Sequence, residues 1–438
     1  MDGEGIVTRI KNYREIYVSP YRDIWVSTMF LCVLGLMMIF SASGSVDYFK
    51  RQLTFVLLGF LVCFIAQFMD YHMLYRYSKV IYVLSIGCIF LLLTPAGVSV
   101  NGATRWLKLF GVQFQVAEAV KIGTIAILSY MIQRYQKGLH KGKLLIWMWG
   151  LGGCAAGLLM VISNDLSSSI VVLGITFCMT FVFTELVAIH VGAIAIIGSA
   201  AAIYVFSIWR NLPSPHELEN MSFRVGRIAA WLSPYKYESD QSFQTLQALY
   251  AIGSGGAVGK GLGNSMQKFM IPEPHTDMIF SILCEELGAG GALLLFSLLS
   301  YLILCLIKAA MASGDFYGYA ISVGVCAHIA VQSLINLAVN LNVFPNTGIA
   351  LPFISYGGTA VFTLLCEIAM VLSVSRISGG LAFVRFGKKK ETKKRRGKLN
   401  EKNIRSIHQI ENRSGKLNRN GRSRTGKKQS GNQSRTSR

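Results

Sequence analysis

The stretch IWVSTMFLCVLGLMMIFSA occupies residues 24–42 and decides the fold class. It carries no charged residue and is close to the roughly 20 apolar residues that a helix needs to cross a bilayer. It follows a charged lead of residues 1–23 and is longer than the apolar core of a cleavable signal peptide. We therefore expect a first membrane span that is retained, after a short N-terminal segment.

The rest of the chain repeats this pattern. Apolar residues make up 52% and charged residues only 15% of the 438 residues, whereas a soluble domain has roughly 25% charged residues. The apolar runs are too long for the alternating strands of a β-barrel, which have about ten residues each. We predict an all-α polytopic membrane protein with ten transmembrane helices, at residues 24–42, 53–69, 80–94, 112–132, 144–162, 168–184, 188–207, 277–307, 317–339 and 359–376.

The net charge of +21 is concentrated at the C-terminus. Residues 387–438 contain 19 Lys and Arg but 3 Asp and Glu, and they are rich in Ser, Asn and Gly. Such a composition predicts a disordered segment. Because the basic residues follow the last span, they indicate the cytoplasmic membrane face and argue against nucleic-acid binding. We expect a membrane domain over residues 24–376 and a basic cytoplasmic tail over 377–438.

Basic residues in the short connections set the orientation. Lys and Arg precede the first span, lie between the second and third, and lie between the fourth and fifth. With ten spans, all of these fall on the side of the tail, so both termini are expected in the cytoplasm. Residues 208–276 then form a large extracellular loop between helices seven and eight, and loops of this length are usually functional.

Metal and nucleotide motifs are missing from the sequence. The nine Cys lie in apolar runs without a CxxC pair, and the seven His show no HExxH spacing. The glycine-rich run of residues 253–263 matches neither a Walker A loop nor GxGxxG. We interpret its glycines as allowing a tight backbone path near the membrane face.

Ionisable residues inside or beside the spans are the strongest functional signal. Each costs about 2.5–3.5 kcal/mol to insert at the centre of a bilayer, so each is a candidate for function. Glu118 and Lys121 share a helix face, which allows a salt bridge, although that could be a packing pair only. The others are Asp165, His275, Asp277, Glu285, Glu286 and Glu367, of which Glu367 could simply snorkel to the membrane face. Together they predict a polar cavity, in either a transporter or an enzyme acting on a lipid-linked substrate.

Three blocks of sequence resemble the SEDS family (shape, elongation, division and sporulation), most closely its FtsW/SpoVE-type members. The resemblance extends over residues 20–380 and leaves out the tail. The blocks are NGATRW at 101–106 with Glu118 and Lys121; residues 247–288, which contain PEPHTDMIF at 272–280; and PNTG at 345–348 followed by LPFISYGG at 351–358.

The resemblance implies an inverting peptidoglycan glycosyltransferase of the cytoplasmic membrane, acting in cell division or sporulation. Such enzymes polymerise lipid II at the outer membrane face and release undecaprenyl pyrophosphate. They work with a class B penicillin-binding protein, a transpeptidase, and other divisome proteins, at the septum. A carboxylate base and cations at the pyrophosphate suit this chemistry. The expected substrate-binding residues are Arg105, Glu118, Lys121, Asp165, His275, Asp277, Glu285 and Ser355, and a divalent ion such as Mg²⁺ or Mn²⁺ could assist.

One position departs from the family pattern. The family's base is expected as an Asp three residues after a Pro of the large loop, and here Tyr237 stands three residues after Pro234. Glu238 and Asp240 are the candidate catalytic residues nearby, unless neither serves. Two alternatives to a polymerase therefore stay open: a lipid II flippase and a non-catalytic scaffold that recruits the transpeptidase.

Overall fold

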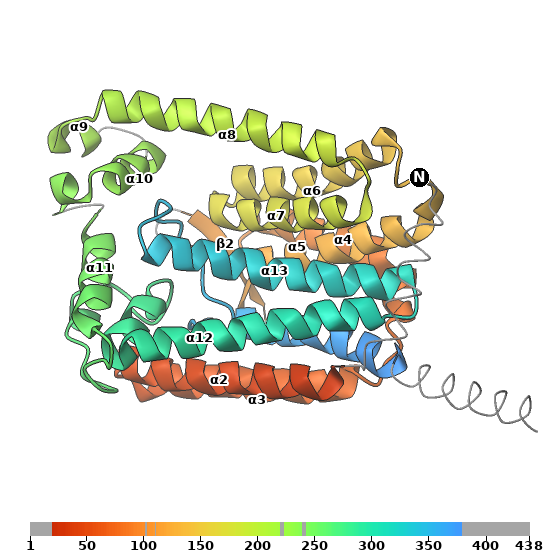
Figure 1. Ribbon diagram of the computed structural model, residues 1–438, viewed down its shortest axis with the longest axis horizontal. Helices are drawn as coiled ribbons and strands as arrows, with labels where there is room; N and C mark the ends of the chain where they lie inside the picture. Colours follow the sequence, from red (N-terminus) through yellow and green to blue (C-terminus); the bar gives the residue numbers. More distant parts are fainter. Residues whose placement is uncertain (1–19, 101–102, 110, 220–222, 239–241, 379–438) are drawn as a thin grey trace, which may run out of the picture. The chain divides into compact units, whose positions relative to one another are not determined.

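The computed structural model of the chain describes residues 20–100, 103–109, 111–219, 223–238 and 242–378 (Figure 1). Within them, ten helices are long and apolar enough to cross a membrane, which confirms the predicted all-α polytopic fold. They are α2 (Tyr21–Ser43), α3 (Val46–Ala66), α4 (His72–Leu91), α5 (Val116–Arg134), α6 (Gly142–Ile162), α7 (Leu166–Phe183), α8 (Val187–Arg210), α12 (Ile279–Ala312), α13 (Phe316–Asn340) and a final helix (Gly358–Ser378).

Three of the described helices form the centre of the bundle. In the most apolar stretch of α5, 78% of residues are buried, and in α13 and in the final helix the share is 67%. In α8 it is 0%, and this helix runs along one edge of the bundle (Figure 1). Lipid is as apolar as a leucine side chain, so close packing and polar contacts, rather than apolarity, decide which helices lie inside. These central helices carry the buried ionisable residues Glu118, Lys121, His328 and Glu367.

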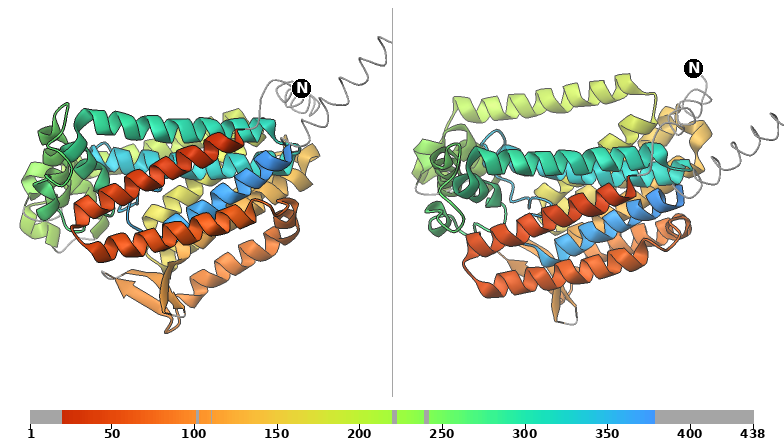
Figure 2. Two further views of the ribbon diagram at one scale, coloured as in Figure 1. Left: turned by 90° about the horizontal axis from the view of Figure 1, so that it is seen from below. Right: turned by 60° about the horizontal axis from the view of Figure 1, so that its bottom comes forward.

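The region before α5 differs from the prediction. Residues 112–115, expected in the fourth span, are the strand β3 (Val112–Gln115) of a small antiparallel sheet with β1 (Gly97–Val100) and β2 (Ala103–Leu109). The strands project from the bundle (Figure 2). In VQFQ, apolar and polar residues alternate, a pattern of period two that favours a strand over a helix. The sheet includes Arg105 in β2, next to Trp106, which pairs with Gln115 just before α5.

Helix α4 also begins earlier than expected. Arg76 and Lys79, assigned to a connection between spans, lie within its first turns. Both side chains lie over aromatic rings, Arg76 over Tyr77 and Lys79 over Tyr130. A cation at a helix end can reach the polar boundary of the membrane while its stem packs on rings. The apolar run therefore underestimated the length of this helix.

The segment between α8 and α12, residues 211–278, is called the large loop here. It contains α9 (Pro215–Glu219), α10 (Phe223–Leu232) and α11 (Phe243–Gly255), with two short 3-10 turns, Pro234–Tyr237 and Gln267–Phe269. The two amphipathic stretches expected in this region are thus helical. Helix α11 lies across the ends of the long helices (Figure 1) and packs on α12.

The glycine-rich part of the loop closes onto a kink in α12. Gly288 interrupts the helix with φ 63° and ψ −161°, a combination that only glycine adopts readily. A Cβ at this position would lie 2.7 Å from the carbonyl oxygen of Ala257. The backbone N–H groups of Lys260 and Gly261 donate to the carbonyls of Glu285 and Glu286, which the kink exposes. The kink in α12 therefore provides the carbonyl groups that hold the glycine-rich part of the loop, and the loop satisfies those carbonyl groups.

We predict that Gly288→Ala destabilises the protein by about 1–3 kcal/mol, because its backbone conformation excludes a side chain. Gly290→Ala is the matched control, since its Cβ would meet only an ordinary contact at 3.9 Å. Thermal unfolding in detergent should show a lower transition temperature for the first variant alone. Equal transition temperatures for both variants would contradict the account of the kink.

Candidate functional site

The carboxylate of Asp277 lies at the end of the large loop, immediately before α12. Its Oδ1 accepts hydrogen bonds from Gln244 Nε2 of α11 at 3.3 Å and from Thr276 Oγ1 at 3.0 Å. Gln244 is itself held by Asn346, whose Nδ2 donates to its Oε1 at 3.0 Å. Three separate segments thus meet at one carboxylate, which the sequence analysis had placed among the substrate-binding residues.

Two buried asparagines of α13 hold the backbone of the same residue. The Nδ2 atoms of Asn336 and Asn340 donate to the carbonyl oxygen of Asp277, at 2.8 and 2.9 Å. Asn336 also donates to Ile349, and Asn340 accepts the N–H and O–H of Ser281 in the first turn of α12. A carbonyl oxygen has two lone pairs, so this one is saturated. The position of Asp277 is therefore fixed by α13.

Arginine side chains give the surroundings a positive charge. Arg227 of α10 lies close enough to Arg105 and to Asp277 to feel both charges. Arg105 donates through its Nη2 to the carbonyl of Asn164 at 3.1 Å, while its buried Nε finds no acceptor among the described residues. A guanidinium with spare N–H groups suits a phosphate oxygen. We did not single out Arg227 from the sequence.

Partial burial shifts the pKa values of these groups. Burial raises the pKa of Asp277 above its ordinary value, and hydrogen bonds from Thr276 and the charge of Arg227 offset this only in part. Burial, together with the like charge of Arg105, lowers the pKa of Arg227. Burial likewise lowers the pKa of the His275 imidazole, which favours its neutral form. A carboxylate whose pKa is raised above its ordinary value is better suited to accepting a proton.

His275 belongs to a cluster of aromatic rings beside this carboxylate. Its ring lies 4.4 Å from that of Tyr48 and 5.3 Å from that of Tyr356. Its carbonyl accepts the N–H of Tyr356 at 2.8 Å, and its buried Nδ1 has no hydrogen-bond partner among the described residues. The residue therefore joins the large loop to the segment before the final helix.

Glu118 and Lys121 form the predicted salt bridge. The Nζ of Lys121 lies 2.8 Å from Glu118 Oε1, and both side chains are almost completely buried. The same Nζ donates to Gln332 Oε1 of α13 at 2.9 Å. Thr363 of the final helix donates to the other oxygen of Glu118 at 3.3 Å. The pair thus connects three helices inside the bundle.

The remaining predicted residues have strong local partners. Asp165 caps α7, because its carboxylate accepts the backbone N–H and the hydroxyl of Ser168. Ser355 accepts the N–H of Leu351 at 2.7 Å and closes a turn. Through these contacts, both residues support the backbone around the site.

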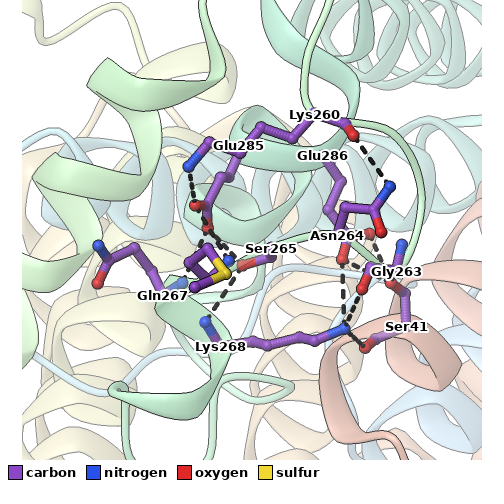
Figure 3. Close-up of polar contacts among 10 residues, drawn as sticks. Ser41, Lys260, Gly263, Asn264, Ser265, Gln267, Lys268, Glu285 and Glu286 are labelled. Carbon is purple, nitrogen blue, oxygen red and sulfur yellow. Dashed lines mark hydrogen bonds and ion pairs between the residues drawn. The ribbon is translucent and has the colours of Figure 1, made fainter.

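Glu285 and Glu286 anchor the glycine-rich part of the loop (Figure 3). Glu285 accepts Lys260 Nζ at 2.6 Å, the hydroxyl of Ser265 and two backbone N–H groups. Glu286 accepts the hydroxyl of Ser41 from α2, and Lys268 lies 3.9 Å from it. A carboxylate so fully engaged has little capacity left for a substrate. Glu285 therefore supports the loop, and its role in substrate binding stays a prediction.

The loop position expected to carry the base looks different. Tyr237 is buried, packs with Leu218 and Ala229, and donates its hydroxyl to the carbonyl of Pro213 at 2.7 Å. Glu238 is exposed, and Asp240 lies outside the described residues. The packing of Tyr237 holds this turn together, and among the described residues no carboxylate takes the place of its side chain.

Among the described residues, no three His, Cys, Asp or Glu side chains gather as a metal site would need. Mg²⁺ requires near-octahedral oxygen ligands and often takes several of them from phosphates and water. The described residues thus supply no cage of their own for Mg²⁺ or Mn²⁺, and the divalent ion stays a prediction.

Sequence reasoning missed the polar face of α13. His328, Gln332, Asn336 and Asn340 recur at every fourth position of an otherwise apolar helix. Residues four apart share one helix face, so this spacing was a readable signal. We had counted charged residues alone, and amides inside a span therefore escaped notice.

Ten spans around a buried polar centre, with a large loop over one end, define a polytopic membrane protein with an intramembrane polar site. The family model described as "Cell cycle protein", which covers FtsW, RodA and SpoVE, matches residues 22–379. The chain belongs to this family, as its sequence blocks predicted.

Similar proteins agree with this assignment. Stage V sporulation protein E of Bacillus subtilis is 33% identical over 375 residues, covering 82% of this chain and 98% of that protein. A probable peptidoglycan glycosyltransferase FtsW of Coxiella burnetii is 32% identical over 381 residues, covering 82% of this chain and 97% of that protein.

Solved structures share the fold. A chain from a structure described as "Structural coordination of polymerization and crosslinking by a peptidoglycan synthase complex" has a TM-score of 0.66 and 26% identity, covering 81% of this chain and 97% of that one. Rod shape determining protein RodA of Thermus thermophilus has a TM-score of 0.56 and 25% identity, covering 81% and 95%. An aspartate-to-alanine variant of that RodA has also been solved.

We predict that Asp277→Asn raises the thermal stability of the protein at neutral pH. A buried acid whose pKa is raised destabilises the fold once it is ionised, so stability falls as pH rises from the ordinary carboxyl pKa of 3.8 through the raised value. The gain in the variant should therefore be largest at high pH and shrink as the pH is lowered. Thermal unfolding between pH 5 and pH 8 measures it.

Glu238→Gln, at an exposed site, is the control and should leave the pH dependence unchanged. An Asp277→Asn variant that is less stable than the parent at every pH would show that the ionised carboxylate is favourable where it lies.

Proposed function

We propose that this protein is a peptidoglycan glycosyltransferase that polymerises lipid II into glycan strands, with Asp277 as the general base. The observation that carries the proposal is one partly buried carboxylate, whose backbone carbonyl is held by two asparagines and whose charge interacts with that of Arg227. Membership of the FtsW, RodA and SpoVE family, and relatives named as glycosyltransferases, support the reaction class.

The residues suit the reaction step by step. A sugar hydroxyl of one substrate attacks the anomeric carbon of another, and its proton passes to Asp277. A new carbon–oxygen bond forms as the bond to the lipid pyrophosphate breaks, with inversion at that carbon. The pyrophosphate leaves with the electron pair. Arg105, Arg227 and, deeper in the bundle, Lys121 are the cations that would stabilise its charge.

The geometry leaves an acceptor position on Asp277. Its Oδ1 is occupied by Gln244 and Thr276, whereas no hydrogen bond to Oδ2 is found among the described residues. Gly348 lies beside Oδ2, at a distance where even a Cβ would make only an ordinary contact, at 3.9 Å. A base must have a lone pair within hydrogen-bond reach of the proton that it takes.

The charge distribution supports an orientation. By the count of spans, most Lys and Arg of the short connections fall on the side opposite the large loop, which favours both termini in the cytoplasm. The large loop and Asp277 then face outwards, at the cytoplasmic membrane and at the division septum. A class B penicillin-binding protein is the partner that the solved synthase complex of a relative supports.

The test is polymerisation of lipid II by the purified protein with its transpeptidase partner. We expect the wild type to make glycan chains and Asp277→Asn to lose at least about 100-fold in rate, the usual contribution of a general base. Glu238→Gln and Asp240→Asn should retain activity, and Glu273→Gln, an exposed acid of the same loop, is the matched control.

If Glu238→Gln or Asp240→Asn loses activity while Asp277→Asn stays fully active, the base is the residue whose substitution abolished activity. A wild-type protein that makes no chains, under conditions in which a related FtsW does, would favour the scaffold. Movement of lipid II across vesicles without polymerisation would favour the flippase.

A further inference from the structure

A histidine and a glutamate face each other at the centre of the bundle, away from Asp277. The Nδ1 of His328 in α13 lies 2.7 Å from Glu367 Oε2 in the final helix, and both residues are fully buried. Neither takes part in the reaction described above. Burying two ionisable groups is costly unless each finds a partner, so the pair calls for a role.

The amide of Gln332 fixes how this pair is protonated. Its Oε1 faces Lys121 Nζ at 2.9 Å, and its Nε2 donates to the carbonyl of Ala350 at 2.9 Å. An ammonium group can only donate and a carbonyl can only accept, so the opposite amide orientation would lose both bonds. The Oε1 atom of Gln332 is therefore an acceptor on all sides.

The Nε2 of His328 lies 2.9 Å from that same Oε1. Two acceptors cannot bond, so Nε2 carries a hydrogen and donates it. The other ring nitrogen, Nδ1, then shares a single proton with Glu367 Oε2, whichever of the two atoms holds it. The pair is electrically neutral as a whole, which suits its apolar surroundings.

Glu367 thereby determines that the Nε2 atom of the His328 imidazole carries a hydrogen. With a proton donor at Nδ1, the ring must present an N–H to Gln332. Without that donor, the other tautomer becomes available and its Nε2 lone pair would face the Oε1 of Gln332. That repulsion would turn the amide away from Lys121.

We propose that His328 and Glu367 are positioning residues that act through Gln332 to aim the ammonium group of Lys121 at the substrate pyrophosphate. Glu118 and Gln332 are the two hydrogen-bond acceptors that the described residues give to this ammonium, which has three N–H groups. With two directions fixed, the third is fixed as well. The proposal rests on the proposed function, which assigns Lys121 to the pyrophosphate.

The test measures binding of undecaprenyl pyrophosphate to the purified full-length protein, so that it needs no turnover. Glu367→Leu should weaken binding about tenfold, the effect of one misdirected charge-assisted hydrogen bond. Glu367→Gln should bind like the wild type, because its amide N–H can donate to Nδ1 and keep the tautomer. In polymerisation assays, Glu367→Leu should raise KM for lipid II far more than it lowers kcat.

A double-mutant cycle shows whether the effect passes through Gln332. Gln332→Leu should weaken binding by itself, and adding Glu367→Leu should then cost little more. Thermal unfolding of every variant identifies losses due to misfolding. If the substitutions only damaged folding, Glu367→Leu and Glu367→Gln would both unfold at a lower temperature. They would then bind undecaprenyl pyrophosphate equally well.

Additive effects of the two Leu substitutions, or equal binding by Glu367→Leu and the wild type, would overturn the proposal. The proposed function is tested independently, since Asp277→Asn should abolish polymerisation yet keep the affinity for undecaprenyl pyrophosphate. The wild type and its variants could bind this lipid as expected while the wild type makes no glycan. That result would contradict the proposed function and leave the role of His328 and Glu367 intact.

Discussion

In the interior of a membrane protein, each backbone N–H and C=O must find a partner within the protein, because lipid offers none. This constraint is sharpest between α13 and the final helix, where residues 341–357 are not helical. The polar face of α13 meets the constraint: Gln332 donates to the carbonyl of Ala350 and Asn336 to that of Ile349. Non-helical backbone within a membrane is tolerated only when it is covered in this way. The same face then reaches Asp277, so the amides that satisfy the segment also hold the proposed base.

The helices that surround this segment are fitted to it. Gly35 of α2 lies against the backbone of Phe353 and Ile354, where a Cβ would collide with the chain. Phe353 itself adopts φ 65°, which is unusual for a bulky residue and indicates that the surroundings determine its conformation. Rigid support of this kind is what a catalytic carboxylate requires, because small errors in its position reduce the rate strongly. The buried salt bridge of Glu118 and Lys121 is joined to the same polar face through Gln332.

The sequence predicted the spans because each is a long apolar run, and length alone distinguishes such runs from strands or soluble helices. The prediction from apolar runs was wrong where a short alternating pattern or charged residues interrupt such a run. The strands β1, β2 and β3 form a sheet before α5, and the charged first turns of α4 lie outside its apolar run. Within the site, Asp277, Arg105 and the pair of Glu118 and Lys121 could be chosen as charged residues near spans. The support from Asn336 and Asn340, and the anchoring role of Glu285, depend on contacts between segments far apart in the sequence, which spacing alone does not encode.

The central claim is that Asp277 takes the proton of the attacking hydroxyl. It is tested most directly by an experimental structure of the protein with lipid II bound at the acceptor position. The account predicts that a carboxylate oxygen of Asp277 lies within about 2.6–3.2 Å of that hydroxyl, with the pyrophosphate near Arg105 and Arg227. A bound substrate whose hydroxyl lies instead against Glu238 or Asp240, with Asp277 out of reach, would contradict it.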